Sequence, residues 1–215
     1  MQQRNAAAKA GIRILINLFL VVIILYAWLS MIMGPNGLFS SRGMVSLRYF
    51  TILSNLLEAA VSIAWICLHR KRRRTAETLK YIAAVSVALT FTTVMVFLGP
   101  LFGYAGMFRG PNFWLHLVAP VAAVLEYICM SEERMGRWEN LFAVLPMILY
   151  GIFYYANNLI NGRGVWPDTN DWYGFLTWGY AVGAVIFAVI VLVTYLLGLL
   201  IRTGHQKAAG RETLL

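Results

Sequence analysis

Two apolar segments of this sequence carry the few polar side chains that could do chemistry. The segment 47–68 contains four of them, Arg48, Thr51, Asn55 and Glu58. At 100° per residue, their spacing keeps all four within an arc of about 80° on a helix. The sequence therefore predicts one polar face, running from near one end of that helix to near its middle.

The segment 112–130 supplies a histidine, His116, and a deeper carboxylate, Glu126. Thr51 and His116 each lie about 6 Å along their own segments, at 1.5 Å per residue, so their depths match if both segments enter from one side. A hydroxyl within hydrogen-bond reach of an imidazole is the arrangement that activates an oxygen nucleophile. Thr51 and His116 are therefore the predicted catalytic pair.

The neighbouring polar residues have a catalytic and a structural interpretation. In the first, Asn55 donates a hydrogen bond to the developing oxyanion, and Arg48 holds a substrate carboxylate or a headgroup phosphate. In the second, the Thr51 hydroxyl bonds the carbonyl one turn earlier and His116 is a packing residue. Glu58 and Arg48 would then form a structural ion pair.

A second polar region lies at the end of the segment 139–158 and in the loop after it. Tyr154 and Asn158 are candidate supporting residues for the site. Asp168 and Asp171 in the loop could orient a histidine or hold a cation, although aspartates are also ordinary turn residues.

The elements that must position these groups are strongly apolar. Of the 215 residues, 60% are hydrophobic and 13% are charged, a balance that indicates a membrane protein. Six runs reach the length of about 20 residues that a bilayer core requires: 12–33, 47–68, 80–98, 112–130, 139–158 and 175–201. We expect one all-α domain over residues 1–215, a six-helix transmembrane bundle.

The distribution of Lys and Arg predicts the orientation of the bundle. Four of the 18 basic residues, Arg42, Arg48, Arg109 and Arg163, fall on one side, and the others lie in the N-terminus, the 69–80 and 131–138 loops and the C-terminal tail. Because cytoplasmic loops are enriched in Lys and Arg, we expect both termini in the cytoplasm. The segments 34–46, 99–111 and 159–174 would then be external.

Other features of the sequence bear on partners. The run from Arg70 to Arg74 lies at a helix end, where it would meet anionic lipid headgroups, and no aromatic platform for nucleic acid accompanies it. No phosphate loop, nucleophile elbow or zinc motif is present, so we predict no cofactor and no metal. Cys67 and Cys129 are expected to be buried thiols.

Three strings carry a family resemblance: RYFTILSNLL, WLHLVAPVAAVLEY and YGIFYYANNLINGRGVWPD. They resemble bacterial six-span integral membrane proteins related to the androgen-induced-gene family, whose animal members hydrolyse fatty acid esters of hydroxy fatty acids. In the animal enzymes a membrane-embedded Thr and His are the catalytic pair. The resemblance implies these roles for Thr51 and His116, and a multi-pass location in a bacterial inner membrane.

The sequence thus predicts an intramembrane hydrolase of a lipid ester, with Thr51 as nucleophile and His116 as general base. Two other functions stay open. One is a non-enzymatic lipid- or ion-binding or transport protein in which Arg48, Glu58, His116 and Glu126 line a polar cavity. The other is an acyltransferase that uses the same Thr and His.

Overall fold

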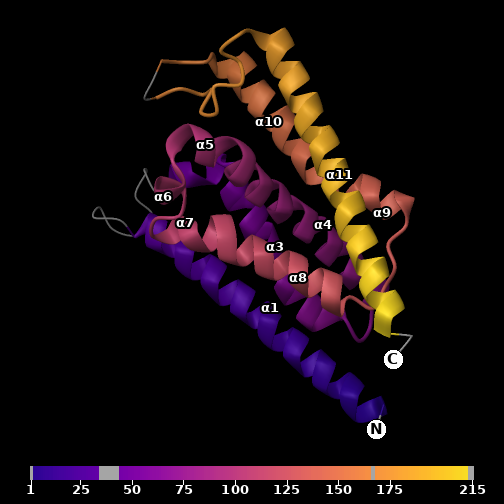
Figure 1. Cartoon of the computed structure of the whole chain (residues 1–215). Coiled ribbons are helices and arrows are strands. Elements are labelled where there is room, and N and C mark those ends of the chain that lie inside the picture. The colour runs from indigo at the N-terminus through magenta and orange to yellow at the C-terminus, as the bar shows by residue number, and fades with distance from the viewer. Residues whose placement is uncertain (1, 34–43, 166–167, 213–215) are drawn as a thin grey trace.

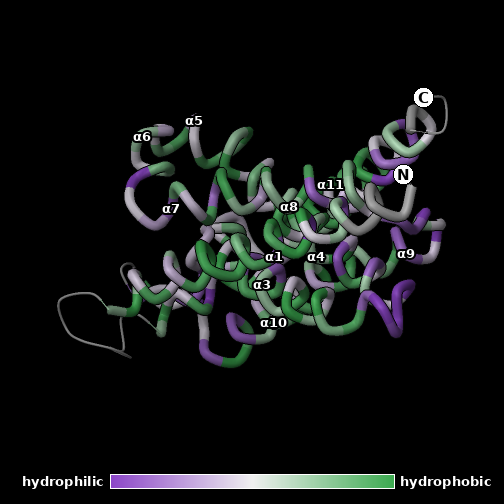
Figure 2. Tube along the Cα trace, turned by 90° about the horizontal axis from the view of Figure 1, so that it is seen from below, coloured by the Kyte–Doolittle hydropathy of each residue, from purple (hydrophilic) through white to green (hydrophobic). Residues whose placement is uncertain are grey.

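The computed structural model describes residues 2–33, 44–165 and 168–212, and every regular element in these ranges is helical (Figure 1). Six helical stretches are long and apolar enough to cross a membrane: Ala8–Ile32, Phe50–Leu68, Arg73–Phe102, Pro111–Met130, Arg137–Asn161 and Tyr180–Gly210. Figure 2 shows hydrophobic residues throughout these helices. The predicted all-α bundle with six spans is confirmed.

Three of the spans are single helices, and three are composite. The single ones are α1 (Gln2–Ile32), α3 (Phe50–Leu68) and α11 (Tyr180–Glu212), and a 3₁₀ turn, η1 (Val45–Arg48), precedes α3. The third span joins α4 (Arg73–Thr93), η2 (Val94–Leu98) and α5 (Gly99–Phe102). After α6 (Tyr104–Met107), the fourth joins α7 (Pro111–Phe113), η3 (Trp114–Val118) and α8 (Ala119–Met130), and the fifth joins α9 (Arg137–Phe142) and α10 (Leu145–Asn161).

Helix α4 lies at the centre of the bundle and contacts α3, α8, α10 and α11. Helix α1 lies on the opposite side of α3 and α8 from α10 and α11 (Figure 1). Ala119 and Ala123 of α8 are fully buried in the apolar core that also contains Leu20 and Ile24 of α1. Small residues at a four-residue spacing let membrane helices approach closely, which explains this packing.

Both termini lie at one end of the molecule, with the 69–72 and 131–136 connections (Figure 1). There Arg73 and Arg74 form ion pairs with three acidic residues, Glu132, Glu133 and Glu139. We call this the basic end. The opposite end, with α5, α6, α7 and the segments 162–165 and 168–179, is the far end.

Two basic residues that the charge count placed on the cytoplasmic side lie inside the bundle. Arg13 is 2% exposed and Lys80 is fully buried, both inside the helix bundle. Their long side chains reach carboxylates on neighbouring helices, which no charge count along the sequence can show. The charge asymmetry of the surface is correspondingly smaller than predicted.

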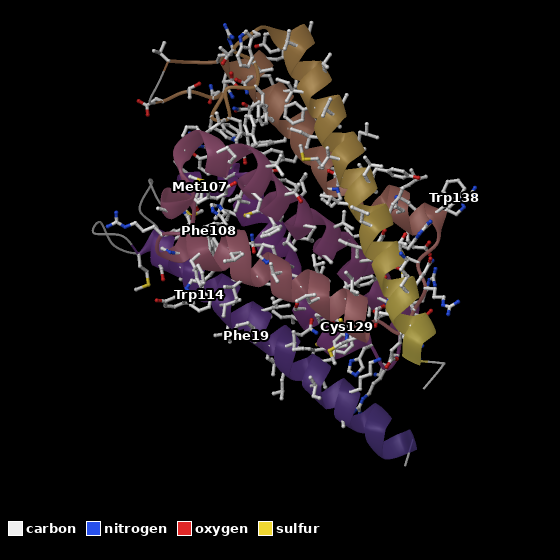
Figure 3. All side chains as sticks on the ribbon, viewed as in Figure 1. Phe19, Met107, Phe108, Trp114, Cys129 and Trp138 are labelled. Carbon is white, nitrogen blue, oxygen red and sulfur yellow. The ribbon has the colours of Figure 1, made fainter. Side chains whose placement is uncertain are left out.

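The prediction of two buried thiols is wrong. Cys67 and Cys129 are both exposed on the outside of the bundle, and Figure 3 shows Cys129 near the basic end of α8. Each occupies a helix position that faces away from the other helices.

Two π-helical turns interrupt the spans, and each ends two residues before a proline. The turn η2 precedes Pro100, and η3 precedes Pro120. A proline inside a helix lacks an N–H, and its ring clashes with the carbonyl four residues earlier. The wider π turn relieves that conflict, and such turns often occur at functional sites.

Candidate functional site

Thr51 lies in the first turn of α3 and borders a small apolar cavity towards the far end. The cavity has a volume of about 40 Å³ and lies among α3, α4, η2, α10, α11 and the 173–175 segment. Its walls are formed by Phe50, Thr51, Leu89, Thr90, Thr93, Leu98, Met147, Tyr150, Tyr173, Phe175 and Ile190. A cavity of this volume holds about one water-sized group, and its mostly apolar wall with a few hydroxyls suits the polar end of an acyl chain, not the chain itself.

The hydroxyl of Thr51 makes no hydrogen bond within the described part of the chain. By contrast, Ser86 and Thr194 bond the carbonyl four residues earlier, at 2.9 and 2.8 Å. The hydrogen bond from the Thr51 hydroxyl to the carbonyl one turn earlier, which was the structural interpretation, is therefore absent among the described residues. The oxygen is available to another partner.

A wider apolar groove runs between α3 and α10 beside this cavity. It has a volume of about 290 Å³ and shares two wall residues, Phe50 and Tyr150, with the cavity at Thr51. Its other walls are mostly apolar side chains, including Leu53 and Phe153, which are exposed on the outside of the bundle. An acyl chain in the bilayer can therefore lie along α3 within reach of the cavity.

His116 lies in the middle of the π turn η3 and is 8% exposed. Its Nδ1 lies 2.7 Å from the backbone carbonyl oxygen of Met107, in α6. Figure 3 shows Met107, Phe108 and Trp114 at the far end of the bundle. Because a carbonyl only accepts, Nδ1 is the donor, and the lone pair of a neutral ring lies on Nε2.

Asn55 connects the helix of Thr51 with the helix of His116. Its side-chain nitrogen donates to the carbonyl of Thr51 at 2.8 Å and to the carbonyl of Leu115 at 3.1 Å. Both amide hydrogens are used, so the predicted role of Asn55 as an oxyanion donor does not fit. No hydrogen bond joins Thr51 directly to His116 among the described residues, and His116 is not part of the cavity wall.

Arg48 does not share the helical face of Glu58. It lies in the 3₁₀ turn before α3, separated from the helix by the extended residue Tyr49. Its guanidinium lies 5.1 Å from the ring centre of Tyr49 and 5.4 Å from that of Trp172. The predicted ion pair of Glu58 with Arg48 is wrong, because Glu58 pairs with Lys80.

Tyr173 adds a polar group to the cavity that the sequence did not single out. Its hydroxyl accepts a hydrogen bond of 3.0 Å from the backbone N–H of Phe50, the first residue of α3. Burial raises the pKa of Tyr173 to about 12, so the phenol is neutral at physiological pH. A neutral phenol can donate its hydrogen to an acceptor in the cavity.

Tyr154 and Asn158 anchor the segment 168–179 and do not line the cavity. The Tyr154 hydroxyl donates to Asp171, which also accepts the backbone N–H of Leu176 at 3.0 Å. Asn158 donates to the carbonyl of Asn170 at 3.0 Å. Asp171 thus holds the loop in place, and Asp168 shows no contact with His116.

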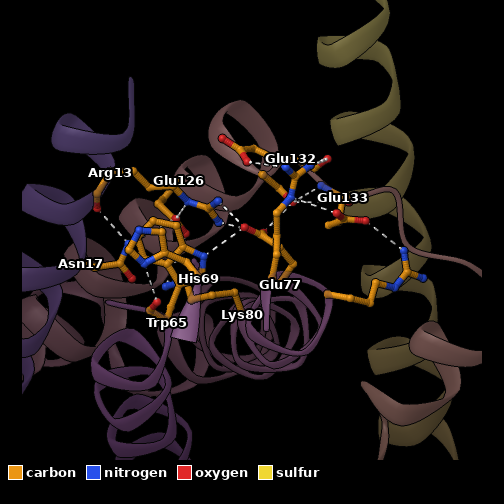
Figure 4. Close-up of polar contacts among 12 residues, drawn as sticks. Arg13, Asn17, Trp65, His69, Glu77, Lys80, Glu126, Glu132 and Glu133 are labelled. Carbon is orange, nitrogen blue, oxygen red and sulfur yellow. Dashed lines mark hydrogen bonds and ion pairs between the residues drawn. The ribbon is translucent and has the colours of Figure 1, made fainter. Parts of the chain in front are cut away.

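The second polar assembly is a buried charge cluster, formed by Arg13 of α1, Glu58 of α3, Glu77 and Lys80 of α4, and Glu126 of α8, each at most 2% exposed. Figure 4 shows the guanidinium of Arg13 between Glu126 and Glu77. Lys80 lies between Glu58 and Glu126 and is ion-paired with both. Glu58 and Glu126, which the sequence placed near the catalytic pair, belong to this cluster.

Three of the five members of this cluster were not identified from the sequence, although the sequence contains a usable signal. Glu77 and Lys80 are three residues apart and share one face of α4, and Arg13 and Asn17 are four apart on α1. A span with two ionisable residues on one face indicates a buried partner on another helix. Within the described ranges, no group of three or more His, Cys, Asp or Glu could hold a metal ion.

Comparisons of the chain with protein-family models, with curated proteins and with solved structures gave no match.

Proposed function

We propose that this protein is an intramembrane hydrolase of a lipid ester, with Thr51 as the nucleophile and His116 as the general base. One observation carries the proposal: the Thr51 hydroxyl is free of hydrogen bonds within the described part of the chain and borders an apolar cavity. A hydroxyl placed in this way can meet the ester of a lipid whose acyl chain lies among the helices. The resemblance of the two segments around Thr51 and His116 supports the same roles.

The reaction would proceed in two acyl-transfer steps. Thr51 Oγ1 attacks the ester carbonyl while His116 Nε2 takes the hydroxyl proton, and the leaving alcohol then receives that proton. Water hydrolyses the resulting threonine ester by the same route and releases the fatty acid. The neutral hydroxyl of Tyr173, in the same cavity, replaces Asn55 as the proposed donor to the oxyanion.

The anchoring of His116 supports its role as a base. The hydrogen bond from Nδ1 to Met107 fixes one ring nitrogen as the donor, so the basic nitrogen is Nε2. Catalytic hydrogen bonds are often long in the free enzyme and shorten when substrate binds. We propose that the π turn η3 provides the adjustment that brings Nε2 to Thr51 Oγ1.

Arg48 is the proposed contact for the charged end of the substrate. It has no acidic partner within the described ranges, and two aromatic rings hold its guanidinium beside α3. A fatty acid ester of a hydroxy fatty acid carries a free carboxylate, and phospholipids carry a phosphate. A guanidinium binds either group with two parallel hydrogen bonds.

The placement of the charges suggests how the bundle sits in a membrane. With the basic end in the cytoplasm, the cavity at Thr51 lies in the outer half of a bacterial inner membrane. The exposed residues Arg70, Lys71 and Arg72 then contact anionic lipid headgroups.

Lipid mass spectrometry of the purified protein tests the proposal. On incubation with a lipid ester, the wild type should release free fatty acid, and Thr51→Ala and His116→Ala should not. Thr203→Ala, on the exposed face of α11 with its hydroxyl bonded to Leu199, is the control and should keep full turnover. Equal turnover in the first two variants and the wild type would contradict the proposed mechanism.

The same experiment separates the other two functions. A lipid that copurifies and stays intact through a long incubation would indicate a binding protein. An ester of an added alcohol acceptor, in place of free acid, would indicate an acyltransferase.

A further inference from the structure

The buried charge cluster has an excess of negative charge. It contains two cations, Arg13 and Lys80, against the three carboxylates of Glu58, Glu77 and Glu126. An uncompensated charge in an apolar interior is costly and is removed by a proton or balanced by a counter-ion. One positive charge is therefore missing when all five groups are ionised.

Glu77 has hydrogen-bond donors on both carboxylate oxygens, and Glu126 is ion-paired with both cations. Glu77 accepts from the guanidinium of Arg13, from Trp65 Nε1 at 3.0 Å and from Ser131 Oγ at 2.8 Å. Glu126 accepts from Arg13 Nε and from Asn17 Nδ2 at 3.3 Å, and its other oxygen lies 3.4 Å from Lys80 Nζ. Both environments stabilise an ionised carboxylate.

Glu58 has a different environment. Its Oε1 accepts from Lys80 Nζ and from Ser62 Oγ at 3.1 Å, whereas Oε2 has no hydrogen-bond partner in the described part of the chain. Glu58 is completely buried, so bulk water does not solvate that oxygen. The side-chain oxygens Glu126 Oε2 and Asn17 Oδ1 also lack a hydrogen-bond donor. The cluster therefore has too few hydrogen-bond donors and too little positive charge. A proton on one carboxylate would remove one negative charge and add one O–H donor.

We propose that Glu58 carries a proton at neutral pH, which makes the buried charge cluster an intramembrane proton-binding site. The proton comes from bulk water and is held as the O–H of the carboxylic acid on Oε2, while Oε1 continues to accept from Lys80 and Ser62. The charged groups around it are Lys80 and Glu77 of α4, Glu126 of α8 and Arg13 of α1. With this proton the five side chains have no net charge.

A water-sized cavity connects the cluster with the basic end. It has a volume of about 30 Å³, and its walls include Arg13, Trp65 and Glu77 from the cluster region and His69 and Glu132 from the surface. A cavity of this size can hold a water molecule. Protons can thus reach the edge of the cluster from the basic end. The proposal does not depend on hydrolysis, because Glu58 is not part of the cavity wall at Thr51.

Infrared spectroscopy of the full-length protein in nanodiscs tests the proposal. At neutral pH the wild type should show the carbonyl band of a protonated carboxyl group, and this band should shift in D₂O and with ¹³C-labelled glutamate. Glu58→Gln, which resembles the protonated acid in shape and charge, should remove the band and keep the wild-type melting temperature. Glu133→Gln, which lies outside the cluster and is paired with Arg73 and Arg74, is the control and should keep the band.

Three results would overturn the assignment. The first is the absence of a glutamate-dependent protonated-carboxyl band in the wild type at neutral pH, a measurement that needs no variant to fold. The second is a band that persists in Glu58→Gln and disappears in Glu126→Gln. The third is a rise in melting temperature with sodium chloride that choline chloride does not produce, together with no such band, because a bound cation would then supply the missing charge.

Discussion

The side-chain amide of Asn55 donates a 3.1 Å hydrogen bond to the backbone carbonyl of Leu115, the residue directly before His116. The same nitrogen donates to the carbonyl of Thr51 on its own helix at 2.8 Å. One buried side chain thus fixes the position of η3 relative to the first turn of α3. In the proposed mechanism this connection positions the two catalytic residues, although Asn55 itself contacts no reacting atom.

Replacing Asn55 with leucine should therefore reduce turnover and stability together. Two buried hydrogen bonds are lost, at a net cost of about 0.5–1.5 kcal/mol each, while the carbonyl of Thr51 still accepts from Ser54 Oγ. Thermal unfolding measured beside lipid-ester turnover would show both losses. Asn161→Ala, on the exposed end of α10, should change neither, and an active Asn55→Leu variant with wild-type stability would refute the positioning role.

Removing one partner from the Arg13 and Glu77 pair should destabilise the bundle strongly. In Glu77→Gln, the buried guanidinium loses its main counter-charge, which typically costs about 3–5 kcal/mol. The measurement is denaturant unfolding of the variants Glu77→Gln, Arg13→Met and their combination. Because the two residues interact, the double variant should lose less stability than the two single losses added together, and strict additivity would show that they are not coupled.

The hydroxyl of Tyr154 should matter for the order of the far-end loop. Tyr154→Phe removes one of the donors to the buried Asp171, a loss of about 1–3 kcal/mol. Limited proteolysis should then cut within residues 162–179 faster than in the wild type. Tyr155→Phe removes an exposed hydroxyl that bonds the carbonyl of Tyr180, and its cleavage rate should match the wild type. Equal rates for both variants would contradict the anchoring role of Tyr154.

Pro120 should be needed for the position of His116. Pro120→Ala restores the backbone N–H at position 120 in α8, so the segment before it can return to a regular α-helix and turn the imidazole away from its present direction. We expect stability to be kept and turnover to fall at least about tenfold, which corresponds to about 1.4 kcal/mol in the barrier. Pro111→Ala, in the first turn of α7, is the control because a proline there costs no helical hydrogen bond. Full activity of Pro120→Ala would exclude this role.

The architecture was largely predictable because it depends on local composition. Long apolar runs identify spans whatever their partners, so all six were found. Their ends were less accurate: the last span begins at Tyr180 instead of 175, because an apolar aromatic stretch from Trp172 to Trp178 forms turns and covers the cavity. The π turns could have been inferred from Pro100 and Pro120, since each proline conflicts with the carbonyl four residues before it.

The polar sites were only partly predictable because their geometry depends on contacts between distant helices. The spacing of Asn55 and Glu58 showed that one face of α3 is polar, and both are buried. The spacing does not show which helix packs against that face. Glu58 was therefore predicted to pair with Arg48, whereas it pairs with Lys80. Lys80 was missed because a lysine at the start of a span looks like an interfacial residue when only the sequence is considered.

The pairing of Thr51 with His116 is tested most directly by peptide mapping after treatment with a fluorophosphonate, which reacts with activated hydroxyl nucleophiles. We predict a covalent adduct on Thr51 in the wild type and its loss in His116→Gln, since general-base assistance typically contributes about 10²–10⁴-fold. A soluble serine hydrolase treated in parallel confirms that the probe is active. A wild-type protein in which Thr51 stays unmodified, or is modified equally without His116, would contradict the claim that these two residues form a catalytic pair.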